Sequence, residues 1–123
     1  MIQPRTIVNI ADNSGAKIGR IFKVLGSSKK RYAEIGETVV LSVQKAEPRK
    51  TIKKKDVLRA VVVRQTKPLR RKDGSYIRFD ENAVVIIEKE KKEPIAGRIF
   101  GPIPREVGEA GFKTIASKAS EIV

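Results

Sequence analysis

Hydrophobic and polar residues alternate in short stretches from Thr6 onward, and this alternation predicts β-strands. The stretches are rich in β-branched residues and cover Thr6 to Ala11, Lys17 to Leu25, Thr38 to Lys45, Leu58 to Arg64, Ser75 to Phe79 and Ala83 to Glu88. Asp73 and Gly74 are the strongest hairpin-turn dipeptide of the chain. Short strands with turns roughly every 8 to 12 residues favour a small antiparallel β-barrel.

The pattern changes beyond Glu93, where Gly and Pro become frequent. Residues 94–104 are expected to form a loop in which Ile99 and Phe100 pack on the barrel and Arg98 points outward. Pro104 suits the first turn of a helix, and apolar residues then recur at helical spacing at Phe112, Ile115, Ala116 and Ala119. We therefore expect a barrel with hairpin arms in residues 1–93, and a loop with short helices packed on it in residues 94–123.

Size and charge narrow the range of partners. A chain of 123 residues with 40% hydrophobic residues fits one domain, residues 1–123. Its 27 Lys and Arg against 14 Asp and Glu give a net charge of +13, which indicates a polyanionic partner. The longest apolar run, Ala83 to Ile87, is far shorter than the ~18 residues of a membrane span. No leader segment is recognisable either, so we expect a cytoplasmic protein with no membrane partner.

Missing residue types exclude several kinds of site. The chain has no Cys and no His, which removes thiolate nucleophiles, zinc-thiolate sites and the commonest general base. Ser14 to Lys17 lacks the spacing of a phosphate-binding loop and is expected to be a hairpin turn. Asp80 and Glu81 are adjacent and would point to opposite faces of a strand, which favours a solvated strand end over a catalytic pair. We therefore predict no enzyme, no metal ligands and no cofactor.

The positive charge lies in the first two thirds of the chain. Up to Arg78 there are 20 basic and 6 acidic residues, a charge of +14, against 7 and 8 afterwards, a charge of −1. The basic residues concentrate in windows 17–31, 45–59 and 64–78, spaced like consecutive hairpins. The expected RNA contacts are the cations Lys29, Lys30, Arg31, Lys53, Lys54, Arg70, Arg71 and Arg78 and the stacking residues Tyr32 and Tyr76.

The aromatic content distinguishes between kinds of nucleic acid. Single-strand binders stack bases on aromatic side chains, and this chain has no Trp, two Tyr and four Phe. All four Phe fall within apolar patterns and are expected in the core: Phe22, Phe79, Phe100 and Phe112. Cations on rigid hairpins suit the phosphates of a folded, double-helical backbone. Structured RNA is therefore the first candidate partner and duplex DNA the second.

A series of motifs extends over the whole chain. The densest stretch is Ala60-Val61-Val62-Val63, followed after nine residues by Asp73-Gly74 and then by Phe79, Asn82 and Val85-Ile86. Further motifs stand in order at Ala11 to Ala16, Arg31 to Ala33, Arg70-Arg71, Tyr76 to Asp80 and Arg98 to Pro102. In this order and spacing the chain resembles the universal large-subunit ribosomal protein fourteen family, in its bacterial and organellar type.

The resemblance implies a mainly β fold: a small five-stranded antiparallel β-barrel, a projecting β-ribbon and a C-terminal loop region carrying short helices. It implies a structural constituent of the large ribosomal subunit, in cytoplasmic or organellar ribosomes, that binds large-subunit ribosomal RNA. It also implies contacts with ribosomal proteins three and nineteen, and a share in bridges to small-subunit ribosomal RNA. In bacteria and organelles a ribosome-silencing factor docks on the C-terminal loop of this family, which would make Arg98 a protein-partner residue.

The chain departs from the family pattern at four positions. Gly97 stands where the family commonly has Thr, Thr114 where Lys is frequent, and Lys50 and Lys55 replace common glycines. Two alternative functions remain open from the residues themselves. One is a free RNA-binding β-barrel that acts as a translation or processing factor, and the other is a carboxylate-dependent nuclease.

Overall fold

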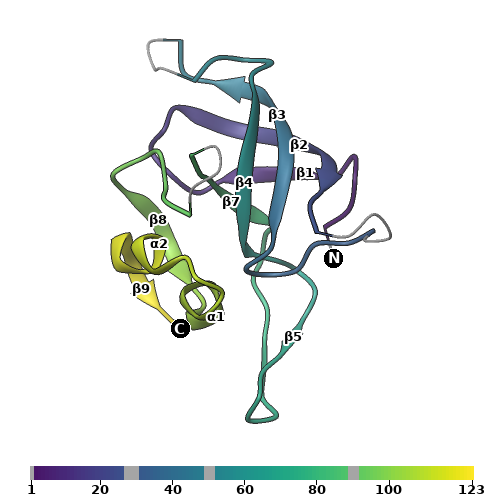
Figure 1. The fold of residues 1–123 in the computed structure, drawn as a ribbon, viewed down its shortest axis with the longest axis vertical. Coiled ribbons are helices and arrows are strands. Elements are labelled where there is room, and N and C mark those ends of the chain that lie inside the picture. The colour runs from purple at the N-terminus through teal and green to yellow at the C-terminus, as the bar shows by residue number, and fades with distance from the viewer. Residues whose placement is uncertain (1, 27–30, 49–51, 89–91) are drawn as a thin grey trace.

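A closed barrel of five strands forms the main body of the protein. The computed structural model describes residues 2–26, 31–48, 52–88 and 92–123, shown in Figure 1. The barrel strands follow in the order β1 (Ile7–Ile10), β2 (Ala16–Val24), β3 (Thr38–Ala46), β4 (Val57–Arg64) and β7 (Ala83–Ile86). Each of them lies within two residues of the bounds that the alternation predicted, so the prediction of a mainly β, five-stranded barrel is confirmed.

The pair of strands that closes the barrel runs parallel. β1 pairs with β7 in parallel at Asn9 with Ala83 and at Ile10 with Val84, while the other four pairings are antiparallel. Strand directions cannot alternate all the way round a ring with an odd number of members, so five strands require one parallel neighbour. Within the barrel, the antiparallel arrangement predicted from the sequence therefore holds at every pairing except this seam.

β4 and β7 are buried on both faces. Residues 60–63 and 83–86 are all fully buried, although neighbouring side chains on a strand point to opposite sides. One set of side chains fills the barrel, and the other packs in the same hydrophobic cluster as Ile103, Val107 and Ile115 from the C-terminal part. The uninterrupted apolar runs of these two strands are therefore explained by a second layer over their outer face.

That second layer is the C-terminal unit, residues 94–123. It contains β8 (Ile99–Ile103), α1 (Arg105–Glu109), α2 (Lys113–Lys118) and β9 (Ala119–Ile122), and β8 pairs with β9 in parallel. Figure 1 shows these elements gathered on one side of the barrel. The predicted short helices are confirmed, but the expected loop 94–104 contains a strand, and Ala119 belongs to β9 rather than to a helix.

A two-stranded ribbon projects from the barrel between β4 and β7. β5 (Leu69–Arg70) pairs with β6 (Tyr76–Ile77), and the ribbon extends below the barrel in Figure 1. Gly74 has φ 91° at its tip, and the Asp73 carboxylate accepts hydrogen bonds from the Ser75 backbone N–H at 3.0 Å and hydroxyl at 2.7 Å. The turn predicted at these two residues, and the projecting ribbon, are confirmed.

The expectation that all four Phe lie in the core is wrong for two of them. Phe112 is buried and Phe79 packs partly buried against the core, but Phe22 and Phe100 are both 50% exposed. Phe22 lies at an irregularity in the register between Ile21 and Lys23, which upsets the alternation. Phe100 follows Ile99, which is buried, so alternation along β8 turns Phe100 outward.

Asp12 joins the end of β1 to β7 at the parallel seam. Its carboxylate accepts hydrogen bonds from the backbone N–H of Ile86 at 3.0 Å and of Ser14 at 3.1 Å. Burial raises the pKa of Asp12, and the bonds from Ser14 and Ile86 offset part of that increase. The sequence indicated only a turn residue here, because a carboxylate that accepts from a distant strand has no local pattern.

Asp12→Ala is expected to lower the free energy of unfolding by about 2 kcal/mol, because the Ile86 N–H stays buried without its acceptor. Asp12→Asn keeps one acceptor oxygen and buries no charge, so its expected loss is smaller. Urea unfolding of both variants and the parent measures the difference. Equal stability of the alanine variant and the parent would contradict this role for Asp12.

Candidate nucleic-acid interface

The two faces of the ribbon carry different side chains. Arg70 is paired with Tyr76, so these two share a face, and alternation places Arg78 on that same face. All three are exposed, Tyr76 at 67%. We call this set the outer face of the ribbon: Arg70, Tyr76 and Arg78. It brings together three predicted RNA contacts, with the ring of Tyr76 across from Arg70 and two residues before Arg78.

The inner face of the ribbon is turned toward the C-terminal unit. Leu69 and Ile77 share it and are partly buried. Arg71 lies two residues after Leu69, so alternation puts it on the same inner face. Its side chain is only 13% exposed, and its Nε forms an ion pair with Glu106 Oε1 at 2.7 Å. Its Nη2 also donates to the Val123 carbonyl at 2.7 Å. The structure therefore gives Arg71 protein contacts that the sequence did not predict.

The turn that leads into β4 presents a row of lysines. Lys53, Lys54 and Lys55 are all exposed, and the Asp56 carboxylate accepts the Lys53 backbone N–H at 2.9 Å. Lys55 has φ 75°, in the left-handed region that favours glycine. The chain thus keeps a glycine-type conformation at one of the positions where the resemblance predicts glycine, and a third exposed cation stands there.

Lys55→Gly is expected to raise the free energy of unfolding by about 1 kcal/mol, because it removes the strain of a side chain at positive φ. Thermal melting compares it with the parent, and Lys54→Gly is the control at the neighbouring position. The control removes the same charge without relieving strain, so it should melt no higher than the parent. A Lys55→Gly variant that melts below the parent would count against strain at this residue.

Two further predicted contacts lie next to the bridge between Ala33 and Ile2. Arg31 and Tyr32 are exposed, Tyr32 at 45%, and the next residue is anchored by backbone bonds between Ala33 and Ile2. Lys29 and Lys30 fall outside the described residues. The structure thus places Arg31, Tyr32, Lys53 and Lys54 at the surface, but on other segments than the ribbon.

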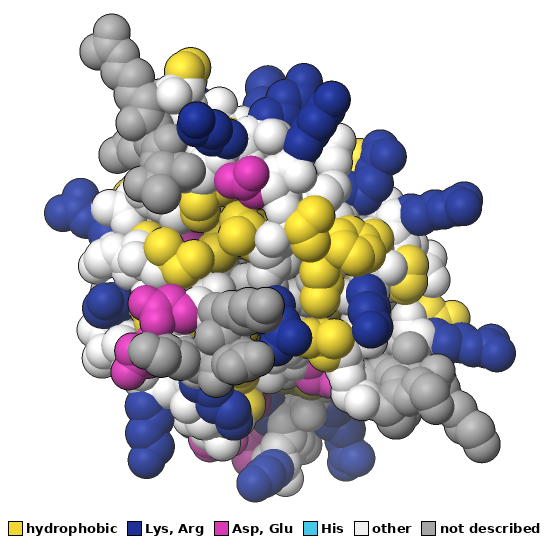
Figure 2. All heavy atoms as spheres, turned by 45° about the horizontal axis from the view of Figure 1, so that its top comes forward, with side chains coloured by type: hydrophobic (Ala, Val, Ile, Leu, Met, Phe, Trp, Pro, Cys, Tyr) yellow, Lys and Arg dark blue, Asp and Glu magenta, His cyan; other side chains and the backbone are white. Residues whose placement is uncertain are grey.

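The outer surface of the barrel carries cations that the sequence analysis did not single out. Lys23 pairs with Val40, and Val40 pairs with Arg59, which places these three in one row across β2, β3 and β4. Arg20 pairs with Ser42 in a neighbouring row. In the view of Figure 2, Lys and Arg side chains lie around much of the edge of the molecule, and hydrophobic side chains lie nearer its centre. The pairing register, rather than adjacency in sequence, brings these cations together.

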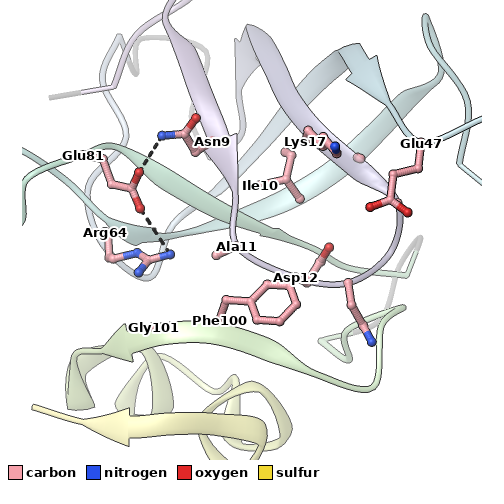
Figure 3. A pocket seen from close by; sticks show the side chains of 13 residues that line it. Asn9, Ile10, Ala11, Asp12, Lys17, Glu47, Arg64, Glu81, Phe100 and Gly101 are labelled. Atoms are coloured by element: carbon pink, nitrogen blue, oxygen red, sulfur yellow. Dashed lines mark hydrogen bonds and ion pairs between the residues drawn. The ribbon is translucent and has the colours of Figure 1, made fainter.

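A pocket of about 720 Å³ lies between the β1–β2 hairpin and β8 (Figure 3). Within it, Arg64 Nη2 lies 3.5 Å from Glu81 Oε1, and Asn9 Nδ2 donates to Glu81 Oε2 at 2.6 Å. Burial lowers the pKa of Arg64, and the charge of Glu81 opposes that shift. Glu81 is therefore part of an ion pair, which corrects the expectation of a solvated strand end. Glu81 thus links Arg64 to Asn9, while Arg64 Nε is buried without a hydrogen-bond partner.

Neither a metal centre nor a membrane span is found among the residues that the structure describes. In that part of the chain, no three His, Cys, Asp or Glu side chains are grouped so that they could hold a metal ion. The helices that it contains are too short or too polar to cross a membrane. Asp80 is exposed, whereas Glu81 bonds to Arg64 and Asn9, so the adjacent pair does not converge.

The exposed Arg98 lies just before β8. Its backbone N–H donates to Asn13 Oδ1 at 3.2 Å, and its carbonyl accepts the Asn13 N–H at 3.2 Å. These two hydrogen bonds attach the backbone at Arg98 to the β1–β2 turn. The side chain of Arg98 lies at the surface, as the sequence predicted. Its contact with a protein partner stays a prediction.

A family model matches the chain that folds into this barrel, ribbon and C-terminal unit. The model of ribosomal protein L14p/L23e matches residues 1–123, the whole length of the chain. The chain belongs to the L14p/L23e family. The resemblance drawn from the motifs is thereby confirmed, and this L14p/L23e family member is a structural protein of the large ribosomal subunit.

Membership places the chain in a structural, non-enzymatic family. It implies that the protein associates with ribosomal RNA and with other ribosomal proteins, and that it is located within the ribosome. The positive charge is consistent with such a partner.

Proposed function

We propose that the protein binds large-subunit ribosomal RNA through the outer face of the ribbon and the exposed cations of the barrel. The observation that carries this proposal is the register that sets Tyr76 beside Arg70 on an exposed face. Two cations on one face of the ribbon suit neighbouring phosphates, and an aromatic ring beside them suits a stacked or unpaired base. The lysines at positions 53–55 and Arg31 are exposed on other segments than the ribbon and add positive charge to the surface.

The finer assignments follow from the location within the large subunit. We propose contacts with ribosomal proteins three and nineteen, and with small-subunit ribosomal RNA at bridges between the subunits. A groove of about 690 Å³ supports a protein neighbour, because Val40, Val57 and Ile95 line it between the cations Lys23 and Arg59. The exposed Arg98 is proposed as a contact for a ribosome-silencing factor, and the charge of −1 after Arg78 favours a protein there over RNA.

Two measurements test the RNA-binding role. Tagged protein in a cell lysate is expected to sediment with the large subunit through moderate salt, whereas a free RNA-binding factor would be released. With purified protein and large-subunit ribosomal RNA, roughly six phosphate contacts predict a slope of about −4 to −5 in log affinity against log salt. A slope near −1 would contradict the proposal, and metal-dependent RNA cleavage would instead support the nuclease alternative.

A further inference from the structure

We propose that Arg71 is a positioning residue, which fixes the outer face of the ribbon relative to the barrel and the C-terminal unit, and is not itself a phosphate ligand. This inference rests on the proposed RNA-binding function and concerns how the same site is held. Arg71 follows directly after Arg70 in sequence, yet the two side chains point to opposite sides of the ribbon. One is free to meet RNA, and the other is held by protein.

Arg71 contacts two elements of the C-terminal unit, through an ion pair at Nε that lacks hydrogen-bond geometry and through a hydrogen bond at Nη2. Nε lies 2.7 Å from Glu106 Oε1 on α1, and Nη2 donates to the Val123 carbonyl just beyond β9. The side chains of Arg71 and Glu106 are 13% and 21% exposed, and Nε has no access to solvent. A planar guanidinium bound to two elements at once resists rotation, so it fixes orientation better than a single contact would.

The ribbon needs such a tether. β5 and β6 have two residues each and pair only with each other, so no neighbouring strand fixes their direction among the described residues. A two-stranded hairpin alone is marginally stable in water. The second link between ribbon and α1, from Arg105 Nη2 to Asp73 Oδ2, is long at 3.9 Å, and both its side chains are more than half exposed. Of the two ion pairs that the structure describes between the ribbon and α1, that of Arg71 is therefore the shorter and the less exposed, and it acts together with the packing of Leu69 against the core.

Positioning and direct binding predict opposite signs for one substitution. Glu106→Gln removes a negative charge close to the ribbon and leaves Arg71 in place. If Arg71 bound a phosphate, this change would release its guanidinium and strengthen RNA binding. If Arg71 positions the ribbon, the same change loosens the tether, and binding weakens although the protein has become more positive.

The test measures the affinity of the full chain for in vitro transcribed large-subunit ribosomal RNA over a range of salt. For Glu106→Gln we expect about fivefold weaker binding with the parent's salt slope, because the phosphate contacts are retained. Glu109→Gln is the matched control, since Glu109 lies on the same helix, is exposed and carries the same charge. Its affinity should equal or slightly exceed that of the parent.

A charge exchange provides the second arm. Arg71→Glu is expected to weaken RNA binding. Arg71→Glu combined with Glu106→Arg is expected to recover part of the lost affinity, although position 71 still has no arginine that could bind a phosphate. Tighter binding by Glu106→Gln, a slope steeper by about one, or no recovery in the exchange would overturn the proposal. A parent protein that shows no salt-dependent RNA binding would overturn the proposed function as well, which separates the two failures.

Discussion

Replacement of Arg70, Tyr76 and Arg78 together by alanine is expected to weaken binding to large-subunit ribosomal RNA by about 100-fold at physiological salt. The three side chains share the exposed outer face of the ribbon, so their loss removes two cations and one stacking ring from one contact surface. Stacking contributes about 1 to 3 kcal/mol per base, and each lost phosphate contact adds to it and makes the salt slope shallower by about one. Filter binding or fluorescence anisotropy over a salt series measures both quantities.

The matched control removes the same charge from another part of the surface. Lys113 and Lys118 are exposed cations on α2, and Lys113→Ala with Lys118→Ala lowers the net charge by the same two units. If long-range attraction alone held the RNA, the two sets would weaken binding equally. If the RNA binds at the ribbon, the ribbon variant should lose much more RNA affinity than the α2 variant. The melting temperatures of both variants should stay close to that of the parent, because these side chains are exposed.

The barrel could be predicted because its strands carry their signal locally. Alternation and β-branched runs marked β2, β3, β4 and β7 to within a few residues, and the Asp73-Gly74 dipeptide marked the ribbon tip. The same runs do not indicate which part of the chain covers the outer face of β4 and β7. Val61, Val63, Val85 and Ile87 are buried, as a strand covered on both faces requires, yet nothing local to them indicates that a C-terminal unit provides the cover.

The errors have a common physical origin in long-range pairing. Phe22 and Phe100 were assigned to the core by their apolar surroundings, but an irregular register exposes one and alternation in a strand exposes the other. That strand, β8, was expected to be a loop because Gly101 and Pro102 interrupt it. It exists because it pairs with β9, twenty residues away in the case of Ile99 and Ala119, and such pairing leaves no local pattern.

In the candidate site, too, local signals could be predicted from the sequence and long-range contacts could not. Arg70, Tyr76 and Arg78 were selected from charge and aromatic content, and their exposure agrees with that selection. Alternation in a strand puts Arg70 and Arg71 on opposite faces, but it does not predict which of the two faces meets the C-terminal unit. Composition identifies the kind of partner, whereas the register decides which cations are available to it.

Gly101 is expected to tolerate substitution least among the glycines whose surroundings the structure describes. It has φ 80° and stands against the guanidinium of Arg64: a Cβ atom built there would overlap Nη1 and lie 3.2 Å from Cζ. Arg64 is buried and paired with Glu81, so it can move only by breaking a partly buried ion pair. Gly101→Ala is therefore expected to lower the free energy of unfolding by about 3 kcal/mol, from the strain of positive φ and the displaced charge together.

Gly97→Ala is the matched control four residues earlier, because a Cβ there would meet no atom within 4 Å and the backbone has no positive φ. It should change stability by less than about 0.5 kcal/mol. Thermal melting should then place the Gly101 variant roughly 10 °C below the parent and the Gly97 variant close to it. Arg64→Lys lacks the Nη1 atom that collides, so the Gly101→Ala substitution should destabilise that background less than it does the parent. An equal loss in both backgrounds would mean that the backbone conformation alone, and not the contact with Arg64, requires glycine at this position.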